Sequence, residues 1–175
     1  YMTYDFKLSD DEILRVMESV KKTGGVLTVH AENHEVIQYL RRNFVEEGNT
    51  DAIYHAKSRP PHTEAEAVGR LLHLSAMAGY PNLYLVHVST KESLMEIRKA
   101  MENGAKNVFV EPCTQYRTLT EEEYLRPDHE GLKFVMSPPL RTKEDCDALW
   151  EGIEEGLVKV VGTDHCPFFF EDKVN

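Results

Sequence analysis

Cysteine is scarce in this sequence, and long apolar runs are missing. The three cysteines, Cys113, Cys146 and Cys166, lie far apart, are odd in number and form no CxxC pair, so neither a disulfide framework nor a zinc ribbon is expected. Free thiols are typical of a reducing cytoplasm, which is the expected location. No apolar stretch approaches the roughly 20 residues that a membrane-spanning helix needs, so no membrane partner is expected.

Positive charge is also in short supply. Lys and Arg number 20 against 30 Asp and Glu, which gives a formal net charge of -10. Binding to nucleic acid needs clustered positive charge that replaces counterions on the phosphates, so no nucleic-acid partner is expected. With 41% hydrophobic residues, the 175-residue chain can still bury a core as one globular unit. This balance suits a protein that acts on small molecules.

Capping signals mark several helices. Ser9 and Glu12 form a capping box ahead of apolar residues at helical spacing, and Gly24 supplies the stop. Comparable signals or helical periodicity recur four more times along the chain. The predicted helices begin at or near Ser9, Glu35, Thr63, Ser89 and Thr142.

Short apolar runs of a different kind lie between these helices. They are four or five residues long, mostly β-branched and continuous rather than alternating, which is typical of strands buried on both faces. Strands that alternate with helices predict βαβ units and a parallel sheet. The five runs are Val26–Val29, Leu83–Val86, Asn107–Val110, Lys133–Met136 and Val158–Gly162.

Ligand-capable side chains follow the runs. His30 comes directly after the first, His87 directly after the second and Asp164 two residues after the fifth. In a β/α barrel the carboxyl ends of the strands converge on one face, where the active site lies; an open doubly wound sheet would instead bind a ligand in a crevice. Two histidines and an aspartate from three strands form a suitable ligand set for Zn²⁺ or a similar ion.

Each of these residues also has an ordinary interpretation. A single histidine after an apolar run is more often a core residue than a ligand, but three equivalent positions in a βα repeat argue against coincidence. For His165, contact with a metal ligand or with the substrate stays open beside an ordinary surface position. A role for Cys166 as a thiol nucleophile fits less well than metal binding by Asp164. Five other histidines are expected at the surface: His34, His55, His62, His73 and His129.

Five motifs together resemble the dihydropyrimidinases and bacterial hydantoinases of the amidohydrolase superfamily. The resemblance covers essentially the whole chain, with the motifs in the family's order. The motif SPPLR at Ser137–Arg141 favours this branch over allantoinases and dihydroorotases. The motifs are HAEN (His30–Asn33), SRPPHTEAEAV (Ser58–Val68), VHVS (Val86–Ser89), SPPLR (Ser137–Arg141) and TDHC (Thr163–Cys166).

The resemblance implies a fold and a place within it. The family fold is a TIM-type (β/α)₈ barrel with a small β-sandwich built from both termini. Residues 1–175 would be a central to C-terminal part of the catalytic barrel, with about five βα units, and would lack the N-terminal strands and the sandwich. The family's His-x-His motif and its bridging lysine have no match here, so we expect a segment of a longer polypeptide that is inactive alone. Relatives of this kind are commonly homotetramers.

The resemblance also implies a site. It holds two divalent metal ions, usually zinc with manganese or cobalt as alternatives, bridged by a hydroxide and by the carboxylated lysine that this chain lacks. His30 and His87 resemble the histidines of the more exposed ion, and Asp164 resembles the ligand of the more buried ion that also carries the proton. Tyr4 resembles the tyrosine that contacts the substrate and the oxyanion, and Ser137 the residue whose backbone holds the ring amide.

The expected activity is metal-dependent hydrolysis of cyclic amides, dihydropyrimidines and hydantoins, to N-carbamoyl amino acids. One alternative is an allantoinase-like hydrolase of cyclic ureides. Another is a non-enzymatic assembly protein like the collapsin response mediator proteins, which share the fold but lack metal ligands. Retention of His87 and Asp164 favours the enzyme.

Overall fold

The protein, represented by a computed structural model that describes residues 1–174, has an α/β fold with a three-stranded parallel sheet. The strands are β1 (Val26–Val29), β2 (Asn82–Leu85) and β3 (Val108–Val110), and they follow one another in this order across the sheet. Strands that neighbour in sequence therefore neighbour in space. Each crossover between them carries helices, as parallel pairing requires.

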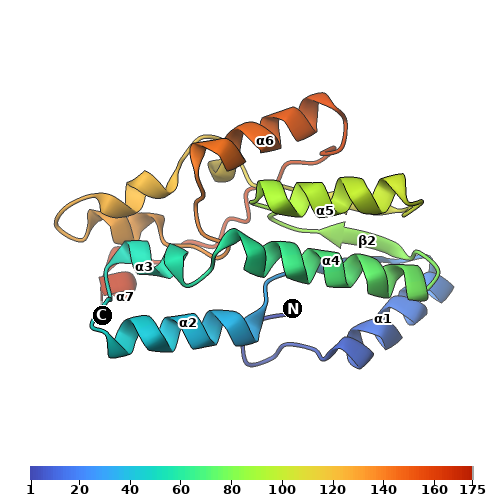
Figure 1. Ribbon diagram of the computed structural model, residues 1–175, viewed down its shortest axis with the longest axis horizontal. Coiled ribbons are helices and arrows are strands. Elements are labelled where there is room, and N and C mark those ends of the chain that lie inside the picture. Colours follow the sequence, from blue (N-terminus) through green and yellow to red (C-terminus); the bar gives the residue numbers. More distant parts are fainter. Residues whose placement is uncertain (175) are drawn as a thin grey trace.

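Helices cover one face of this sheet (Figure 1). α1 (Asp10–Thr23), α4 (Pro61–Met77), α5 (Lys91–Glu102) and α6 (Lys143–Glu154) pack side by side in that order, and α4 and α5 lie directly over the strands. Residues 1–174 include no helix that is both long and apolar enough to cross a membrane. The other helices are α2 (His34–Glu46), α3 (Ala52–Lys57) and α7 (Phe170–Val174), with the 3-10 helices η1 (Gln115–Arg117), η2 (Glu121–Leu125) and η3 (Glu130–Phe134).

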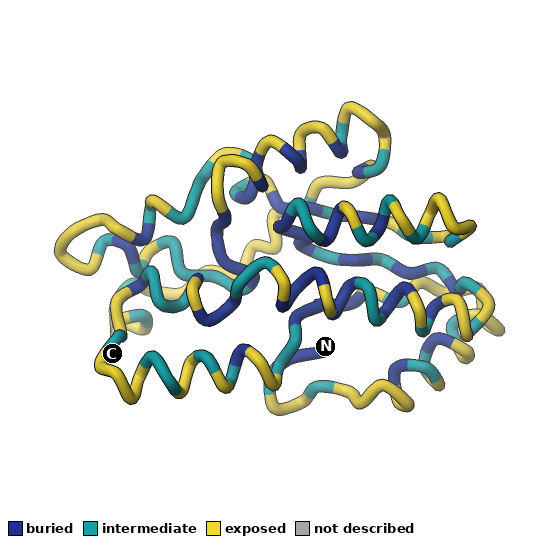
Figure 2. Tube along the Cα trace, in the orientation of Figure 1, coloured by how far each residue is buried: buried dark blue, intermediate teal, exposed yellow. Residues whose placement is uncertain are grey.

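The two faces of the sheet differ in burial. Leu83 and Leu85 have no exposed surface and lie in the core beneath the helices, where Figure 2 shows buried residues concentrated. On the opposite face, Thr28 pairs with Tyr84 and Tyr84 pairs with Phe109, so these three residues form a row across the sheet. Phe109 in that row is 38% exposed. The expectation that the strands are buried on both faces is therefore wrong for this chain.

Two of the five expected strands are not found in residues 1–174. The run Lys133–Met136 begins inside the 3-10 helix η3, so its assignment as a strand was wrong. In Val158–Gly162, Gly162 forms one isolated parallel bridge with Cys113, and Val160 is 37% exposed. A strand is stabilised by a series of hydrogen bonds to a neighbouring strand. Within residues 1–174, Lys133–Met136 pairs with no strand, and Val158–Gly162 has only the single bridge at Gly162. The expected count of about five βα units is not confirmed.

The capping signals located the helices to within a few residues. The capping boxes at Ser9 and Thr142 are both formed, with side-chain and backbone bonds in both directions. The fourth helix begins two residues before Thr63, at Pro61, where the missing N–H of proline costs nothing. The cap of α5 is Thr90, one residue after the expected position.

The buried face of β2 is expected to contribute strongly to stability. Leu85 has no exposed surface, so Leu85→Ala should lower the free energy of unfolding by about 2–5 kcal/mol, from lost burial and the cavity left behind. Chemical unfolding followed by circular dichroism measures this. Met95→Ala on α5 is the control, since Met95 is 55% exposed and a surface change should stay within about 0.5 kcal/mol. Equal losses in both variants would contradict the assigned core.

Candidate active site

Two predicted metal ligands, His30 and His87, face each other at the carboxyl ends of neighbouring strands. The parallel register aligns Val29 with Leu85, so β1 and β2 end at the same edge of the sheet. Nδ1 of His30 lies 2.8 Å from Nε2 of His87, and the two residues are 5% and 6% exposed. The structure therefore brings this pair together, as the sequence predicts.

The backbone at His87 is left-handed, with φ of 41°. Strict alternation along a strand would direct residue 87 to the same side as Leu85, beneath the helices; the left-handed turn breaks that alternation and lets the ring meet His30. Tyr4 (φ 70°) and Asp164 (φ 47°) share this conformation, and in residues 1–174 seven non-glycine residues have it. Such strained positions gather at functional sites, so three of the predicted site residues fit this pattern.

Glu32 lies behind His30. Its Oε2 is 2.8 Å from Nε2 of His30, and the residue has no exposed surface. Burial raises the pKa of Glu32, but the hydrogen bond and charge of His30 and the charges of Arg59 and Arg141 outweigh it, so the pKa lies below its ordinary value. Burial and the charge of His30 lower the pKa of His87 to about 3. Glu32 is therefore a carboxylate that can accept a hydrogen bond from His30, and His87 is a neutral imidazole, the form in which histidine binds a metal.

Tyr4 and Ser137 lie beside the histidine pair. The ring of Tyr4 is centred 5.3 Å from that of His30. Burial raises the pKa of Tyr4, and a side-chain hydrogen bond with Ser137 partly offsets this. The phenol is therefore protonated at neutral pH and can donate a hydrogen bond. Both residues are partly exposed, which leaves them accessible to a ligand.

Asp164 is the predicted ligand that the structure does not join to the pair. It is exposed, and within residues 1–174 no hydrogen bond or ion pair links it to His30 or His87. His165 and Cys166 beside it are exposed as well. In this same part of the chain, no cluster of three or more His, Cys, Asp and Glu residues is arranged to hold a metal ion. Two imidazoles fit a divalent ion in chemistry but make half of a tetrahedral site.

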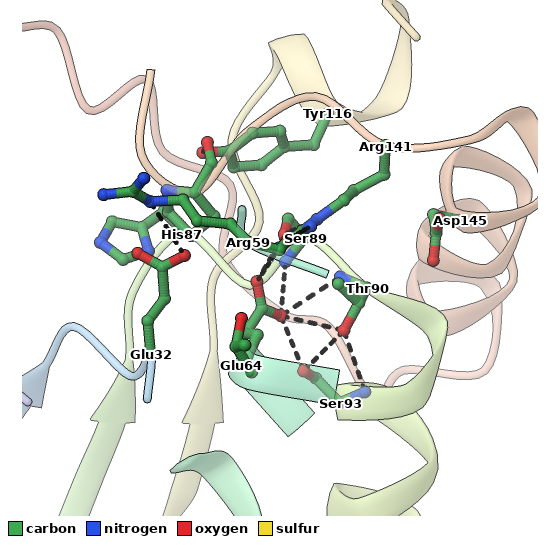
Figure 3. Close-up of polar contacts among 12 residues, drawn as sticks. Glu32, Arg59, Glu64, His87, Ser89, Thr90, Ser93, Tyr116, Arg141 and Asp145 are labelled. Atoms are coloured by element: carbon green, nitrogen blue, oxygen red, sulfur yellow. Dashed lines mark hydrogen bonds and ion pairs between the residues drawn. The ribbon is translucent and has the colours of Figure 1, made fainter. Parts of the chain in front are cut away.

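A buried glutamate that the sequence did not single out holds the turn after His87 (Figure 3). Glu64 of α4 is 2% exposed, and its Oε1 accepts hydrogen bonds from the backbone nitrogens of Ser89 (3.0 Å) and Thr90 (3.2 Å). The hydroxyl of Ser93 adds a third at 2.7 Å, and that of Ser89 donates to Oε2. A carboxylate at the N-terminus of α5 also suits the helix dipole. Glu64 therefore fixes the segment that positions His87.

Two buried arginines connect the two glutamates. Nε of Arg59 is 3.6 Å from Oε1 of Glu32, and Nη2 of Arg141 is 3.7 Å from Oε2 of Glu64. Arg141 also donates to the backbone oxygen of Arg59 and, at 3.0 Å, to Oγ of Ser89. Two carboxylates and two guanidinium groups balance in charge, which makes their joint burial tolerable. The sequence signal for this network was the charged residues inside the SRPPHTEAEAV and SPPLR motifs.

His55 corrects an expectation of the sequence analysis. It was expected at the surface, but it is half-buried and its Nε2 donates to the backbone oxygen of Met136 at 2.7 Å, one residue before Ser137. Burial lowers the pKa of His55 to about 4, and the positive charge of Arg59 adds to this effect. His34 is likewise half-buried. The remaining three are exposed as expected: His62, His73 and His129.

The low pKa of His55 predicts a pH-dependent stability. The folded state keeps His55 neutral down to about pH 4, whereas the unfolded chain takes up the proton near its ordinary pKa of 6.5. The contribution of neutral His55 to the free energy of unfolding is therefore complete above pH 6.5, and it is lost as pH falls toward 4. His55→Gln, which keeps a donor for Met136, should flatten this decline by about 1–3 kcal/mol in unfolding experiments across that window. His73→Gln is the exposed control; the same slope in wild type and His55→Gln would exclude the assignment.

Comparison with known proteins gives consistent relatives, although no family model matches the chain. It is 44% identical over 164 residues to a D-hydantoinase from Ralstonia pickettii, covering 94% of this chain and 35% of that protein. It is 44% identical over 168 residues to a D-phenylhydantoinase from Escherichia coli K12, covering 96% of this chain and 36% of the relative. The chain thus spans about a third of the length of the curated relatives it matches.

Solved structures agree with these matches. A dihydropyrimidinase from Brevibacillus agri superposes with a TM-score of 0.93 at 43% identity, and a D-hydantoinase from a Bacillus species with 0.93 at 44%; each covers 97% of this chain and 37% of the other. A dihydroorotase from Campylobacter jejuni, 17% identical with a TM-score of 0.59, shares the fold. By sequence and by structure, the chain is similar to one segment of hydantoinases and dihydropyrimidinases, about a third of their length.

Proposed function

We propose that the protein containing this chain is a metal-dependent hydrolase of cyclic amides, acting on hydantoins or dihydropyrimidines. The observation that carries the proposal is the buried pair of imidazoles, Nδ1 of His30 facing Nε2 of His87 across 2.8 Å. An assembly protein has no need of such a pair, and the relatives named for hydantoin and dihydropyrimidine hydrolysis support the substrate class.

His30 and His87 would hold one divalent ion, with zinc the first choice and manganese or cobalt compatible with the same ligands. Bound there, the ion would supply Lewis acidity and a water of lowered pKa. Further ligands of this ion would come from parts of the protein outside residues 1–174, and Asp164 would bind the second, more buried ion. A second ion, the bridging lysine and a homotetramer rest on the family resemblance alone, and a cytoplasmic location rests on the three unpaired cysteines.

The chain's own residues would divide the remaining work. Hydrolysis adds water across the ring amide, so that hydroxyl joins the carbonyl carbon and a proton joins the leaving nitrogen. The protonated phenol of Tyr4 would donate a hydrogen bond to the carbonyl oxygen as negative charge develops there. Ser137, which interacts with Tyr4, would hold the ring amide, and Asp164 would carry the proton to the nitrogen. The product is an N-carbamoyl amino acid.

The sheet and its helices fit a larger barrel domain. We propose that the three strands are an arc of a (β/α)₈ barrel, whose active site lies at the carboxyl ends of the strands. The single layer of helices α1, α4, α5 and α6 suits the outside of such a barrel. The open row of Thr28, Tyr84 and Phe109 would then face its interior, and residues 1–175 would be a central to C-terminal part of the catalytic domain.

Substrate and metal dependence can be tested together on the whole protein. With zinc, manganese or cobalt supplied, we expect hydrolysis of hydantoin and dihydrouracil in preference to allantoin, followed by release of the N-carbamoyl product. Chelation should abolish turnover and metal return should restore it, and His87→Ala should not be restorable. Preference for allantoin would assign an allantoinase-like enzyme instead. A metal-replete protein without turnover on all three substrates would exclude the proposal.

The role of Tyr4 gives a separate prediction. Tyr4→Phe removes one donor to the developing oxyanion and should lower kcat by about 10²–10³-fold with little change in KM. Tyr39→Phe on α2 is the matched control, because Tyr39 is 57% exposed and away from the histidine pair. Steady-state kinetics measures both. A loss confined to KM would instead assign Tyr4 to substrate binding alone.

A further inference from the structure

Both ring nitrogens of His30 are engaged, and by different partners. Nδ1 faces His87, and Nε2 lies 2.8 Å from Oε2 of Glu32. A carboxylate accepts hydrogen bonds and donates none, so the proton of a neutral His30 ring belongs on Nε2. This leaves a lone pair on Nδ1, so in the metal-free state Nε2 of His87 donates the hydrogen bond to Nδ1 of His30. His87 frees its Nε2 for a metal when its proton lies on Nδ1 instead.

The second oxygen of Glu32 has a different role. Within residues 1–174, buried Oε1 has no hydrogen-bond partner, and neither has Nε of Arg59, which lies 3.6 Å away. At this distance the guanidinium balances the charge of the carboxylate without forming a hydrogen bond to it. One oxygen of Glu32 therefore orients the imidazole of His30. The other faces the guanidinium of Arg59, as Figure 3 shows.

Arg59 is itself tied to the rest of the site. Its backbone oxygen accepts a hydrogen bond from Arg141, whose Nε donates to Ser89 in the turn after His87. A continuous set of buried contacts thus runs from the ring of His30 to the segment that carries His87. Neither glutamate could turn away without leaving a buried charge uncompensated.

We propose that Glu32 is a positioning residue of the candidate metal centre: it holds His30 in the Nε2–H tautomer, so that Nδ1 of His30 and Nε2 of His87 are presented together to one divalent ion. This inference rests on the proposed function. Carboxylates that orient a ligating histidine in this way commonly account for 10–100-fold in metal affinity.

Two substitutions test separately the two roles of the Glu32 carboxylate, as hydrogen-bond acceptor for His30 and as the charge opposite Arg59. Glu32→Gln keeps a carbonyl oxygen within reach of Nε2 but removes the negative charge opposite Arg59. Glu32→Asp keeps the charge but withdraws the oxygen by one methylene. We expect Glu32→Asp to lower the affinity for zinc by about 10–100-fold. Glu32→Gln should retain most of the zinc affinity, but it should lower the thermal unfolding midpoint more than Glu32→Asp does.

The measurements are made on the whole protein. Competition with a chelator gives the affinity for zinc, and ¹H–¹⁵N correlation spectra of the metal-free, histidine-labelled protein identify the tautomer of His30. Wild type and Glu32→Gln should show Nε2–H, and Glu32→Asp should show a population of Nδ1–H. Tyr124→Phe is the control for general loosening, since it removes a buried hydrogen bond from the backbone of Leu140 and should leave both readouts unchanged.

The outcomes distinguish this inference from the proposed function. The positioning role of Glu32 is wrong, and the proposed function stands, if wild type binds zinc but Glu32→Asp binds it more tightly than Glu32→Gln. The same holds if all variants bind zinc equally. If wild type binds no zinc, manganese or cobalt, the proposed function fails. The tautomer spectra then still decide whether Glu32 sets the state of His30.

Discussion

The parallel pairing of β1 with β2 is the interaction on which the candidate site depends. Its register aligns Val29 with Leu85, so the residues that follow the two strands leave the sheet at one edge. Backbone hydrogen bonds set this register, and the side chains at the exit points then decide the chemistry. Because His30 and His87 occupy these points, imidazoles 57 residues apart in sequence lie 2.8 Å apart in space.

Buried charges keep that edge in place. An ionised carboxylate without exposed surface costs several kcal/mol unless it is compensated, and Glu32 and Glu64 are compensated in two ways. Hydrogen bonds set their direction, to the ring of His30 and to the turn at Ser89. Arg59 and Arg141, at 3.6 and 3.7 Å, balance the charge without hydrogen-bond geometry. Direction and neutralisation are thus separate contributions of the same two side chains.

This division explains what the sequence could predict. His30 and His87 were predictable because local patterns mark strand ends, and Val26–Val29 was located at its observed bounds. Glu64 was not, since an acidic residue in a first helical turn is ordinary at a surface and its hydrogen-bond partners lie 25 to 29 residues away. The runs at Lys133 and Val158 have strand-like composition, but a strand exists only where a neighbour pairs with it. Composition carries no information about that neighbour.

His87, which lies in the candidate site, and Asp164, which lies apart from it, share a left-handed backbone conformation. A left-handed conformation at a non-glycine residue costs about 1–3 kcal/mol and persists where surrounding contacts hold it. At His87 those contacts are present, because Glu64 binds the following turn. Asp164 has the same strained backbone, yet residues 1–174 surround it with little, since the stretch from Thr163 to Phe169 is exposed. A role for Asp164 beside the histidines therefore requires contacts supplied by other parts of the protein, which suits relatives of which this chain spans 35%.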